Sequence, residues 1–116
     1  MGKRILIVED DPNLRKVLYF TFHSRGYDTA VAEDGAGALD IAQTFKPDVA
    51  VIDLGLPDMS GHELGLKLKQ LPDLQEIKLF ALTGSDRPED FKESEKAGFI
   101  RHVVKPPDLD EIESFF

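Results

Sequence analysis

The sequence predicts an α/β protein in which a doubly wound parallel sheet of five strands is covered by five helices on its two faces. Two apolar runs, "ILIV" at 5–8 and "VAVI" at 49–52, are short and largely β-branched, and they lack polar alternation. Such runs are typical of strands that are buried on both faces. Strand-like and helix-like segments alternate five times with short joints. This alternation favours a parallel sheet with right-handed crossovers.

The strands differ in the strength of their signal. The run "IKLFAL" at 77–82 resembles the two runs already named in its apolar character. A weaker segment, "TAVA", occupies 29–32, and only the short "VV" at 103–104 marks the last strand. Each of the five segments is followed by a stretch with helical or turn character.

The first two helices have clear ends. Asp11 followed by Pro12 is the pattern of an N-cap and a first helical residue. Apolar residues then recur at helical spacing until Gly26, which is expected to end the helix. A second helix is expected over 36–45, because its apolar residues share one face and Pro47 follows it.

Three further helices are expected in the second half of the chain. One begins after Ser60, where the hydroxyl can cap the helix, and its apolar stripe consists of Leu64, Leu68 and Leu71. The next, over 87–98, is polar and ends at Gly98, and its charged part at 86–96 is expected to be a solvated face. The last begins in the segment 108–116.

Length and composition limit the possible functions. The 116 residues are expected to form one domain, 1–116. Lys and Arg number 14 and Asp and Glu number 22, so the net charge of −8 argues against direct binding to nucleic acid or to an anionic membrane. The absence of cysteine excludes disulfides and thiolate metal sites. Because the sequence shows neither a membrane span nor a secretory signal, a cytoplasmic location is expected.

Polar residues follow four of the predicted strands, at the edge where open parallel sheets bind ligands. Three adjacent carboxylates repel one another unless a cation lies among them, so they either solvate a loop or form part of a metal site. In chain order, the polar residues at this edge are Glu9, Asp10, Asp11, Asp53, Thr83 and Lys105.

Together these residue types favour phosphoryl transfer. Asp53 could attack a phosphoryl group as a nucleophile, with a divalent cation reducing the repulsion between the two negative groups. Glu9 and Asp10 could supply the oxygen ligands that Mg²⁺ prefers. Lys105 and Thr83 could bind phosphate oxygens by charge and by hydrogen bonding.

Four motifs, "ILIVEDD", "VIDLGLPDMSG", "ALTG" and "VVKPPDLDE", occur in this order. They closely resemble the motifs of the response-regulator receiver domain of two-component signalling, and the resemblance covers essentially the whole chain. It implies the CheY-like, flavodoxin-like fold with strand order 2-1-3-4-5. It also implies a signalling phosphoprotein that is not an enzyme acting on other substrates and that catalyses only its own phosphorylation and dephosphorylation.

The resemblance assigns roles to individual residues. Asp53 would be the phosphoacceptor, with a phosphohistidine on a histidine kinase or a histidine phosphotransfer protein as the donor. Glu9, Asp10, Asp53 and the backbone carbonyl of Gly55 would bind Mg²⁺ or Mn²⁺. Asp11 lies one place beyond the acidic pair, so we interpret it as the cap of the first helix.

Further roles follow from the resemblance in the second half of the chain. Thr83 and Lys105 would bind the phosphoryl oxygens, and the Lys105–Pro106 peptide would be cis. Thr83 would also move on phosphorylation, together with a switch residue three places before the lysine. In this chain the switch residue is His102, where Tyr or Phe is more common in the family.

Two small residues occupy positions that influence phosphate lifetime in the family. These are Gly55, two residues after the phosphoacceptor, and Ser85, two residues after Thr83. We hypothesise that water reaches the acyl phosphate readily and that self-dephosphorylation is fairly quick. The signal would then pass to a downstream effector protein or an output domain, and the chain is either a stand-alone regulator or part of a larger regulator or hybrid kinase.

Other interpretations remain open at this point. The chain could be an interaction domain that keeps the fold without the chemistry, or a metal-dependent phosphatase that works through an aspartyl phosphate. The phosphatase commonly needs a second acid two residues after the nucleophile, where this chain has Gly55. The histidines at 23, 62 and 102 lack metal-ligand spacing, and we expect those outside the switch to be solvated or to cap helices.

Overall fold

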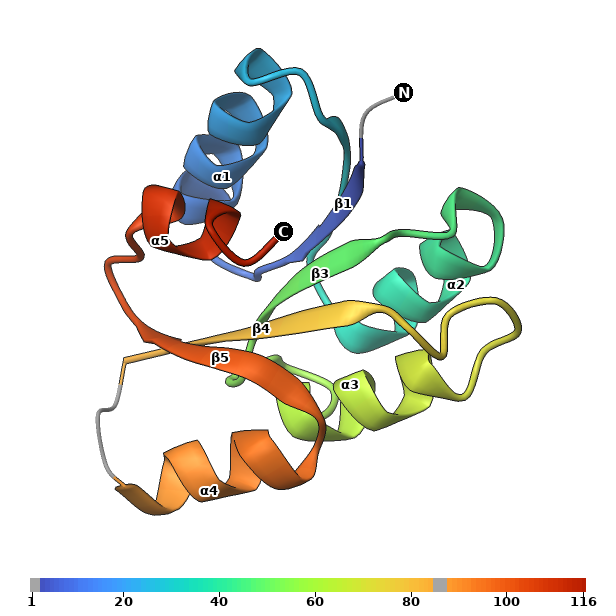
Figure 1. Ribbon diagram of the computed structural model, residues 1–116, viewed down its shortest axis with the longest axis vertical. Helices are drawn as coiled ribbons and strands as arrows, with labels where there is room; N and C mark the ends of the chain where they lie inside the picture. The colour runs from blue at the N-terminus through green and yellow to red at the C-terminus, as the bar shows by residue number, and fades with distance from the viewer. Residues whose placement is uncertain (1–2, 85–87) are drawn as a thin grey trace.

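The five strands of the described chain form one parallel sheet in the order β2-β1-β3-β4-β5 (Figure 1). A computed structural model describes residues 3–84 and 88–116, and the side chains of all of these except 88–91. The strands are β1 Arg4–Val8, β2 Asp28–Ala32, β3 Val49–Asp53, β4 Lys78–Thr83 and β5 Phe99–Val104. The helices in these residues are α1 Pro12–Ser24, α2 Gly35–Phe45, α3 Gly61–Lys69, α4 Pro88–Lys96 and α5 Leu109–Glu113. The predicted fold is confirmed.

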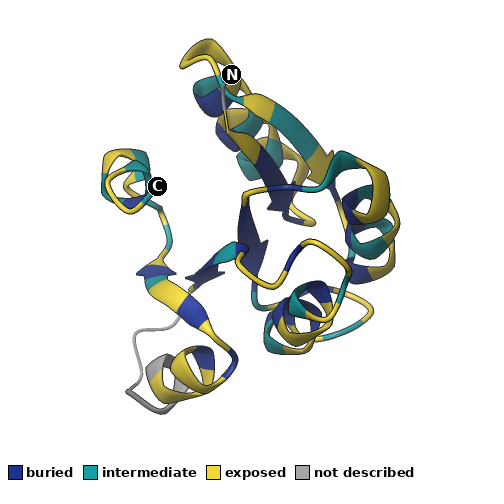
Figure 2. Cartoon of the chain, turned by 45° about the vertical axis from the view of Figure 1, so that its right-hand side comes forward, coloured by how far each residue is buried: buried dark blue, intermediate teal, exposed yellow. Residues whose placement is uncertain are grey.

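The helices cover the sheet in two layers (Figure 1). Helices α1 and α5 place Leu18, Phe22 and Ile112 on one face, in a core that also contains Ile5 and Phe80. Helices α2 and α3 place their apolar residues on the other face, and α4 packs along β5. Figure 2 shows that the central strands are buried while the outer faces of the helices are exposed. The central strands therefore hold the residues at their carboxyl ends in fixed positions.

The predicted helix starts are confirmed where a side chain was expected to cap the helix. Asp11 Oδ1 accepts a hydrogen bond from the Asn13 N–H at 3.0 Å. Ser60 Oγ accepts one from the Glu63 N–H at 3.1 Å. Each bond satisfies a backbone donor that has no partner within its own helix.

The last strand is longer than the sequence predicts. The prediction of 103–104 is wrong because β5 is an edge strand, and buried and exposed residues are mixed along it. Arg101 and His102 interrupt the apolar run, Ile100 is exposed although it is apolar, and the register against β4 shifts near Phe99, at the Leu79/Phe80 step. An edge strand needs no continuous apolar run, so an apolar pattern underestimates its length.

Smaller corrections concern the ends of elements. Helix α3 ends at Lys69, so Leu71 lies beyond the helix on which it was expected. Its N–H still donates to the Leu68 carbonyl at 3.1 Å, and its side chain packs against the core. The sequence predicts that Asp53 and Thr83 lie just after their strands, but they are the last residues of β3 and β4. Both side chains therefore belong to rigid strand ends.

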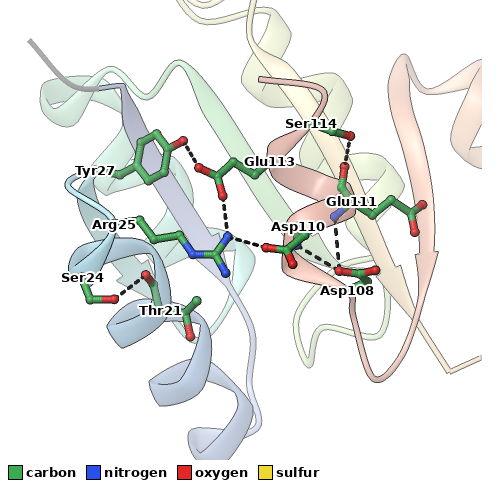
Figure 3. A network of polar contacts seen from close by, with 9 residues as sticks. All are labelled: Thr21, Ser24, Arg25, Tyr27, Asp108, Asp110, Glu111, Glu113 and Ser114. Atoms are coloured by element: carbon green, nitrogen blue, oxygen red, sulfur yellow. Dashed lines mark hydrogen bonds and ion pairs between the residues drawn. The ribbon is translucent and has the colours of Figure 1, made fainter.

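Polar contacts link α5 to the region between α1 and β2 (Figure 3). The Arg25 guanidinium contacts Glu113 Oε1, and its Nη1 lies 3.0 Å from Asp110 Oδ1. The Tyr27 hydroxyl donates to Glu113 Oε2 at 2.6 Å. We call Arg25, Tyr27, Asp110 and Glu113 the α1–α5 clasp.

No helix among the described residues combines the length and the apolar character that crossing a membrane requires.

Candidate functional site

Three carboxylates converge at the carboxyl ends of the central strands. Glu9 directly follows β1, and Asp53 ends β3, which pairs with β1 in parallel. One carboxylate oxygen from each of Glu9, Asp10 and Asp53 lies within 4.8 Å of the other two. Glu9 and Asp53 are buried, while Asp10 is exposed. The structure thus brings together the acidic residues that the sequence singled out, apart from Asp11, which caps α1.

Lys105 reaches this cluster from the segment after β5. Its Nζ lies 2.9 Å from Glu9 Oε1 and 3.4 Å from Asp53 Oδ1. Its backbone N–H donates to the Thr83 carbonyl at 2.7 Å, which joins the ends of β4 and β5. The Lys105–Pro106 peptide bond is cis. Thr83 is buried at the end of β4, next to β3 in the sheet.

The buried carboxyl of Glu9 favours its neutral form. Desolvation raises the pKa of Glu9 to about 7, although the Lys105 ammonium and the Asp11 N–H act in the opposite direction. The Asp11 N–H donates to Glu9 Oε2 at 3.1 Å. At neutral pH this carboxyl is therefore partly protonated, and a bound cation would favour its ionised form.

Asp53 has the opposite tendency. Burial opposes its ionisation, but the Gly55 N–H, the contact with Glu9 and the charge of Lys105 outweigh burial and hold the pKa of Asp53 below its usual value. The Gly55 N–H donates to Asp53 Oδ1 at 3.0 Å. Asp53 is thus ionised at neutral pH, which a nucleophilic carboxylate requires. The pKa of Lys105 is raised, because Glu9 and Asp53 outweigh the effect of its burial, so Lys105 remains a cation.

The loop after β3 is fixed by backbone hydrogen bonds and places Gly55 beside the Asp53 carboxylate. The Leu54 N–H donates to the Leu82 carbonyl at 2.9 Å, and the Gly61 N–H donates to the Leu54 carbonyl at 3.1 Å. A Cβ placed on Gly55 would lie 3.8 Å from Asp53 Oδ1, so a side chain at Gly55 would stand beside the carboxylate. Gly55 itself is exposed. This places Gly55 where a bulky residue would shield Asp53 from water.

One neighbour of the acidic cluster was not foreseen from the sequence. Arg15 Nη1 donates to the backbone carbonyl of Glu9 at 3.0 Å and lies 3.4 Å from that of Asp10. The backbone N–H of Arg15 donates to the Asp11 carbonyl at 2.9 Å, so Arg15 lies one helical turn after the cap of α1. A basic residue one turn into a helix that starts at an acidic edge is the signal that could have identified it. Arg15 holds the backbone that carries the two acidic side chains.

His102 belongs to a half-buried polar cluster on the α3–α4 side of the sheet. Ser94 Oγ lies 2.8 Å from His102 Nδ1 and 2.8 Å from His62 Nε2. Ser94 is only 2% exposed, and the His62 ring packs edge-on against Phe99. The expectations of a solvated His62 and a fully solvated face over 86–96 are therefore wrong at these positions. The helical spacing did not indicate that Ser94 faces β5.

One predicted site residue, Ser85, lies outside the described residues. The other predicted residues can each be placed. Asp53 and Thr83 end neighbouring strands, Glu9 and Asp10 follow β1, and Lys105 follows β5.

The ligand set fits a hard divalent cation. Carboxylate oxygens from three residues lie within 4.8 Å of one another, and hard cations such as Mg²⁺ prefer oxygen ligands. Crowding of buried carboxylates also costs free energy, which a bound cation would reduce. The cluster is thus suited to a cation that keeps part of its coordination for water or for a phosphate.

Comparison with known proteins agrees with this geometry. The family model of the response regulator receiver domain matches residues 5–115. Sporulation initiation phosphotransferase F of Bacillus subtilis (strain 168) is 34% identical over 112 residues, which are 97% of this chain and 89% of that protein.

Solved structures show the same likeness. The chemotaxis response regulator CheY4 of Vibrio cholerae superposes with a TM-score of 0.93 at 26% identity, over 100% of both chains. The signal receiver domain of a signal transduction histidine kinase from Syntrophus aciditrophicus gives a TM-score of 0.85 at 31% identity, over 98% of this chain and 86% of that one. The match of nearly the whole chain to the family model identifies this protein as a member of the response regulator receiver domain family, the signalling modules of two-component systems.

Proposed function

We propose that the chain is a phosphoacceptor module in which Asp53 receives a phosphoryl group from a phosphohistidine. The observation that carries this proposal is the state of Asp53, a buried carboxylate held ionised beside the Lys105 ammonium and the Gly55 N–H. A carboxylate in this environment stays ionised at neutral pH and is therefore able to attack phosphorus.

The proposed transfer needs only the phosphohistidine, Asp53 and a proton from solvent. An oxygen of Asp53 forms a bond to phosphorus while the phosphorus–nitrogen bond of the phosphohistidine breaks. The imidazole nitrogen takes the electron pair of that bond and then a proton from solvent. Asp53 becomes an aspartyl phosphate, which water later hydrolyses to the free carboxylate and inorganic phosphate.

Glu9, Asp10, Asp53 and the backbone carbonyl of Gly55 would hold a Mg²⁺ or Mn²⁺ ion. When bound, the ion reduces the repulsion between the carboxylates and the incoming phosphoryl group. The closeness of three carboxylate oxygens supports this assignment. Arg15 supports the site indirectly, since it binds the backbone carbonyls of the two residues that follow β1.

Thr83 and Lys105 would bind the oxygens of the transferred group. The Lys105 Nζ already lies 3.4 Å from Asp53 Oδ1, so it can follow the phosphoryl oxygens without leaving the site. Thr83 lies at the end of the strand beside Asp53 and carries a hydroxyl donor. Both groups favour the more negative product of the transfer.

His102 would link the phosphorylated site to a partner surface. It lies on β5, opposite Ala81, and its ring is hydrogen-bonded to Ser94 of α4. Movement of Thr83 on phosphorylation would alter the space beside β5, and His102 would carry this change to α4. His102→Ala should take up the phosphoryl group like wild type but bind a downstream partner less tightly, and unchanged binding would contradict this role.

The partners proposed are a histidine kinase or histidine phosphotransfer protein as donor and a downstream effector or output domain as receiver of the signal. We further propose that residues 1–116 act as one domain in the cytoplasm, without direct contact to nucleic acid or membrane. Small residues at Gly55 and Ser85 would allow water to reach the phosphoryl group and shorten its lifetime.

Intact mass spectrometry tests the proposal. The protein is incubated with a small acyl-phosphate donor and Mg²⁺, with and without a chelator. Wild type should gain one phosphoryl group, and the gain should disappear with the chelator and in Asp53→Asn. Asp48→Asn is the matched control, because Asp48 immediately precedes the opposite end of the same strand. If the folded wild type gains no phosphoryl group and binds no phosphate mimic, the proposed function is wrong.

A further inference from the structure

Asp58 in the loop between β3 and α3 binds the first turn of a different helix. Its Oδ1 accepts a hydrogen bond from the Gly35 N–H at 2.8 Å, and its Oδ2 accepts one from the Ala36 N–H at 2.9 Å. These are the first two residues of α2, more than twenty residues earlier in the chain. Both carboxylate oxygens are therefore used to join the loop to α2.

The neighbouring residue reinforces this attachment. The Met59 side chain lies directly over Gly35, where an added Cβ would come within 2.5 Å of the Met59 Sδ. Two consecutive loop residues, Asp58 and Met59, thus contact the start of α2, one by hydrogen bonding and one by packing. The Gly35 and Ala36 N–H groups also hold the pKa of Asp58 below its usual value, so the carboxylate is ionised at neutral pH.

The same loop carries part of the proposed metal site. At its first end, the Gly55 N–H donates to Asp53 Oδ1 at 3.0 Å, and the Gly61 N–H closes the loop on the Leu54 carbonyl at 3.1 Å. Between these two fixed points, the attachment to α2 restrains the loop from the side. Gly55 has no Cβ to restrict its backbone dihedral angles, so the orientation of its carbonyl depends on how the loop is held.

We propose that Asp58 is a positioning residue of the metal site, which keeps the Gly55 carbonyl oriented as a ligand by anchoring the β3–α3 loop to the first turn of α2. This inference rests on the proposed function, because it assumes that the Gly55 carbonyl binds the cation. It assigns no contact between Asp58 and the cation or the phosphoryl group. Its role would be that of an outer residue that orients a ligand.

The chain offers a matched control for this role. Asp34 caps the same helix, since its Oδ1 accepts a hydrogen bond from the Gly37 N–H at 2.8 Å. Asp34→Ala and Asp58→Ala therefore both remove a carboxylate from the first turn of α2. The difference is that Asp58 also fixes the loop after β3, whereas Asp34 belongs to the segment that immediately precedes α2.

The experiment measures the affinity of the full chain for Mn²⁺ by calorimetry, with wild type, Asp58→Ala, Asp58→Asn and Asp34→Ala. Loss of an outer residue of this kind typically weakens metal affinity by about 10-fold or more. We expect a loss of about 10-fold for Asp58→Ala, and a smaller loss for Asp58→Asn, because the amide keeps one acceptor oxygen. Asp34→Ala should stay within about 2-fold of wild type, since the Asp34 carboxylate accepts the Gly37 N–H of its own helix and the Asp58 attachment to Gly35 and Ala36 is kept.

The outcomes separate this inference from the proposed function. If wild type binds Mn²⁺ and Asp58→Ala binds it as tightly as Asp34→Ala does, the positioning role is wrong while the proposed function stands. If wild type neither binds Mn²⁺ nor accepts a phosphoryl group, both are wrong. Should Asp58→Ala fail to fold, Asp58→Asn decides, and an affinity equal to wild type would overturn the positioning role.

Discussion

At the scale of single residues, the environments of two neighbouring carboxyl groups push their pKa values apart. Glu9 is buried beside Lys105 and has a raised pKa, whereas Asp53 accepts the Gly55 N–H and has a lowered one. Such separation lets two acids at one site take different roles. In the proposed function, Asp53 would be the ionised nucleophile, and Glu9 would become a full anion when a cation binds.

The raised pKa of Glu9 predicts how stability depends on pH. The pKa of Glu9 is 4.5 in its ordinary, unfolded environment and about 7 in the folded state. Between these two pH values, Glu9 therefore carries more of its proton in the folded state than in the unfolded chain. The free energy of unfolding should therefore fall as pH rises through this window, when no divalent cation is present. In Glu9→Gln, urea unfolding at a series of pH values should show a much smaller fall.

Magnesium should have the same effect as that substitution. A bound cation favours the ionised carboxylate, so saturating Mg²⁺ should reduce the fall in stability between pH 4.5 and about 7. Asp53 affects stability in a different pH range, because its pKa is lowered from the ordinary value of 3.8. Its ionised carboxylate stabilises the folded state above pH 3.8, and this stabilisation is lost as pH falls further. A wild-type profile that is flat in the upper window without metal would contradict the pKa proposed for Glu9.

Sequence patterns locate the site residues that stand at strand ends, but not the residues that position them. Asp53 and Lys105 could be predicted because parallel strands bring their carboxyl ends to one edge. Asp58 and Ser94 could not, because Asp58 bonds a helix that is distant in the sequence and Ser94 lies on a helix face that helical spacing leaves undetermined. Their contacts depend on how the elements pack.

At the scale of elements, the edge strand β5 shows why local patterns fail in one place. Its residues alternate irregularly between core and solvent, and it pairs through a register shift with β4. The central strands β1 and β3 are buried along nearly their whole length, so their apolar runs are continuous and easily recognised. Burial on two faces therefore decides how much of a strand the sequence reveals.

The α1–α5 clasp is expected to stabilise the packing of the short helix α5. Tyr27→Phe removes the hydrogen bond to Glu113 and should lower the free energy of unfolding by roughly 1–2 kcal/mol, as for a hydrogen bond to a charged acceptor that is partly exposed. Urea unfolding checks this value. The pKa of Glu113 is lowered, first by the Tyr27 hydroxyl and then by Arg25, so the contribution should shrink as pH falls and this carboxylate is protonated.

Tyr19→Phe is the control for this substitution. Tyr19 also packs against the core on the α1 side of the sheet. The carboxylate of Glu113, however, contacts Tyr27 and Arg25, so Tyr19 is not part of the clasp. The control should therefore change stability much less than Tyr27→Phe does. Equal losses in the two variants would mean that the clasp contributes nothing specific.

At the scale of the whole molecule, the fold depends on two cores separated by the sheet. On the α1–α5 side, Phe22 is fully buried and contacts the Phe116 ring at a centroid distance of 5.8 Å. Phe20, two residues earlier in α1, is 63% exposed. The two phenylalanines of one helix thus separate the effect of core burial from the effect of losing an aromatic ring.

Phe22→Ala should cost about 3–5 kcal/mol, because a large buried side chain is lost and the site cannot collapse fully. This is a large part of the total stability of a typical domain, about 5–15 kcal/mol. Phe20→Ala should change stability by less than about 1 kcal/mol. Chemical unfolding of both variants tests the pair, and a similar loss in each would contradict the packing described for α1.

The role of Asp53 as phosphoacceptor is tested by locating the phosphoryl group in the chain. After reaction with the acyl-phosphate donor and Mg²⁺, borohydride reduces an aspartyl phosphate to homoserine, and peptide mass spectrometry identifies the converted residue. We expect conversion at Asp53 alone, in wild type and in Asp48→Asn. Conversion at Glu9, at Asp10 or at any residue other than Asp53 would contradict the assignment of Asp53 as the phosphoacceptor.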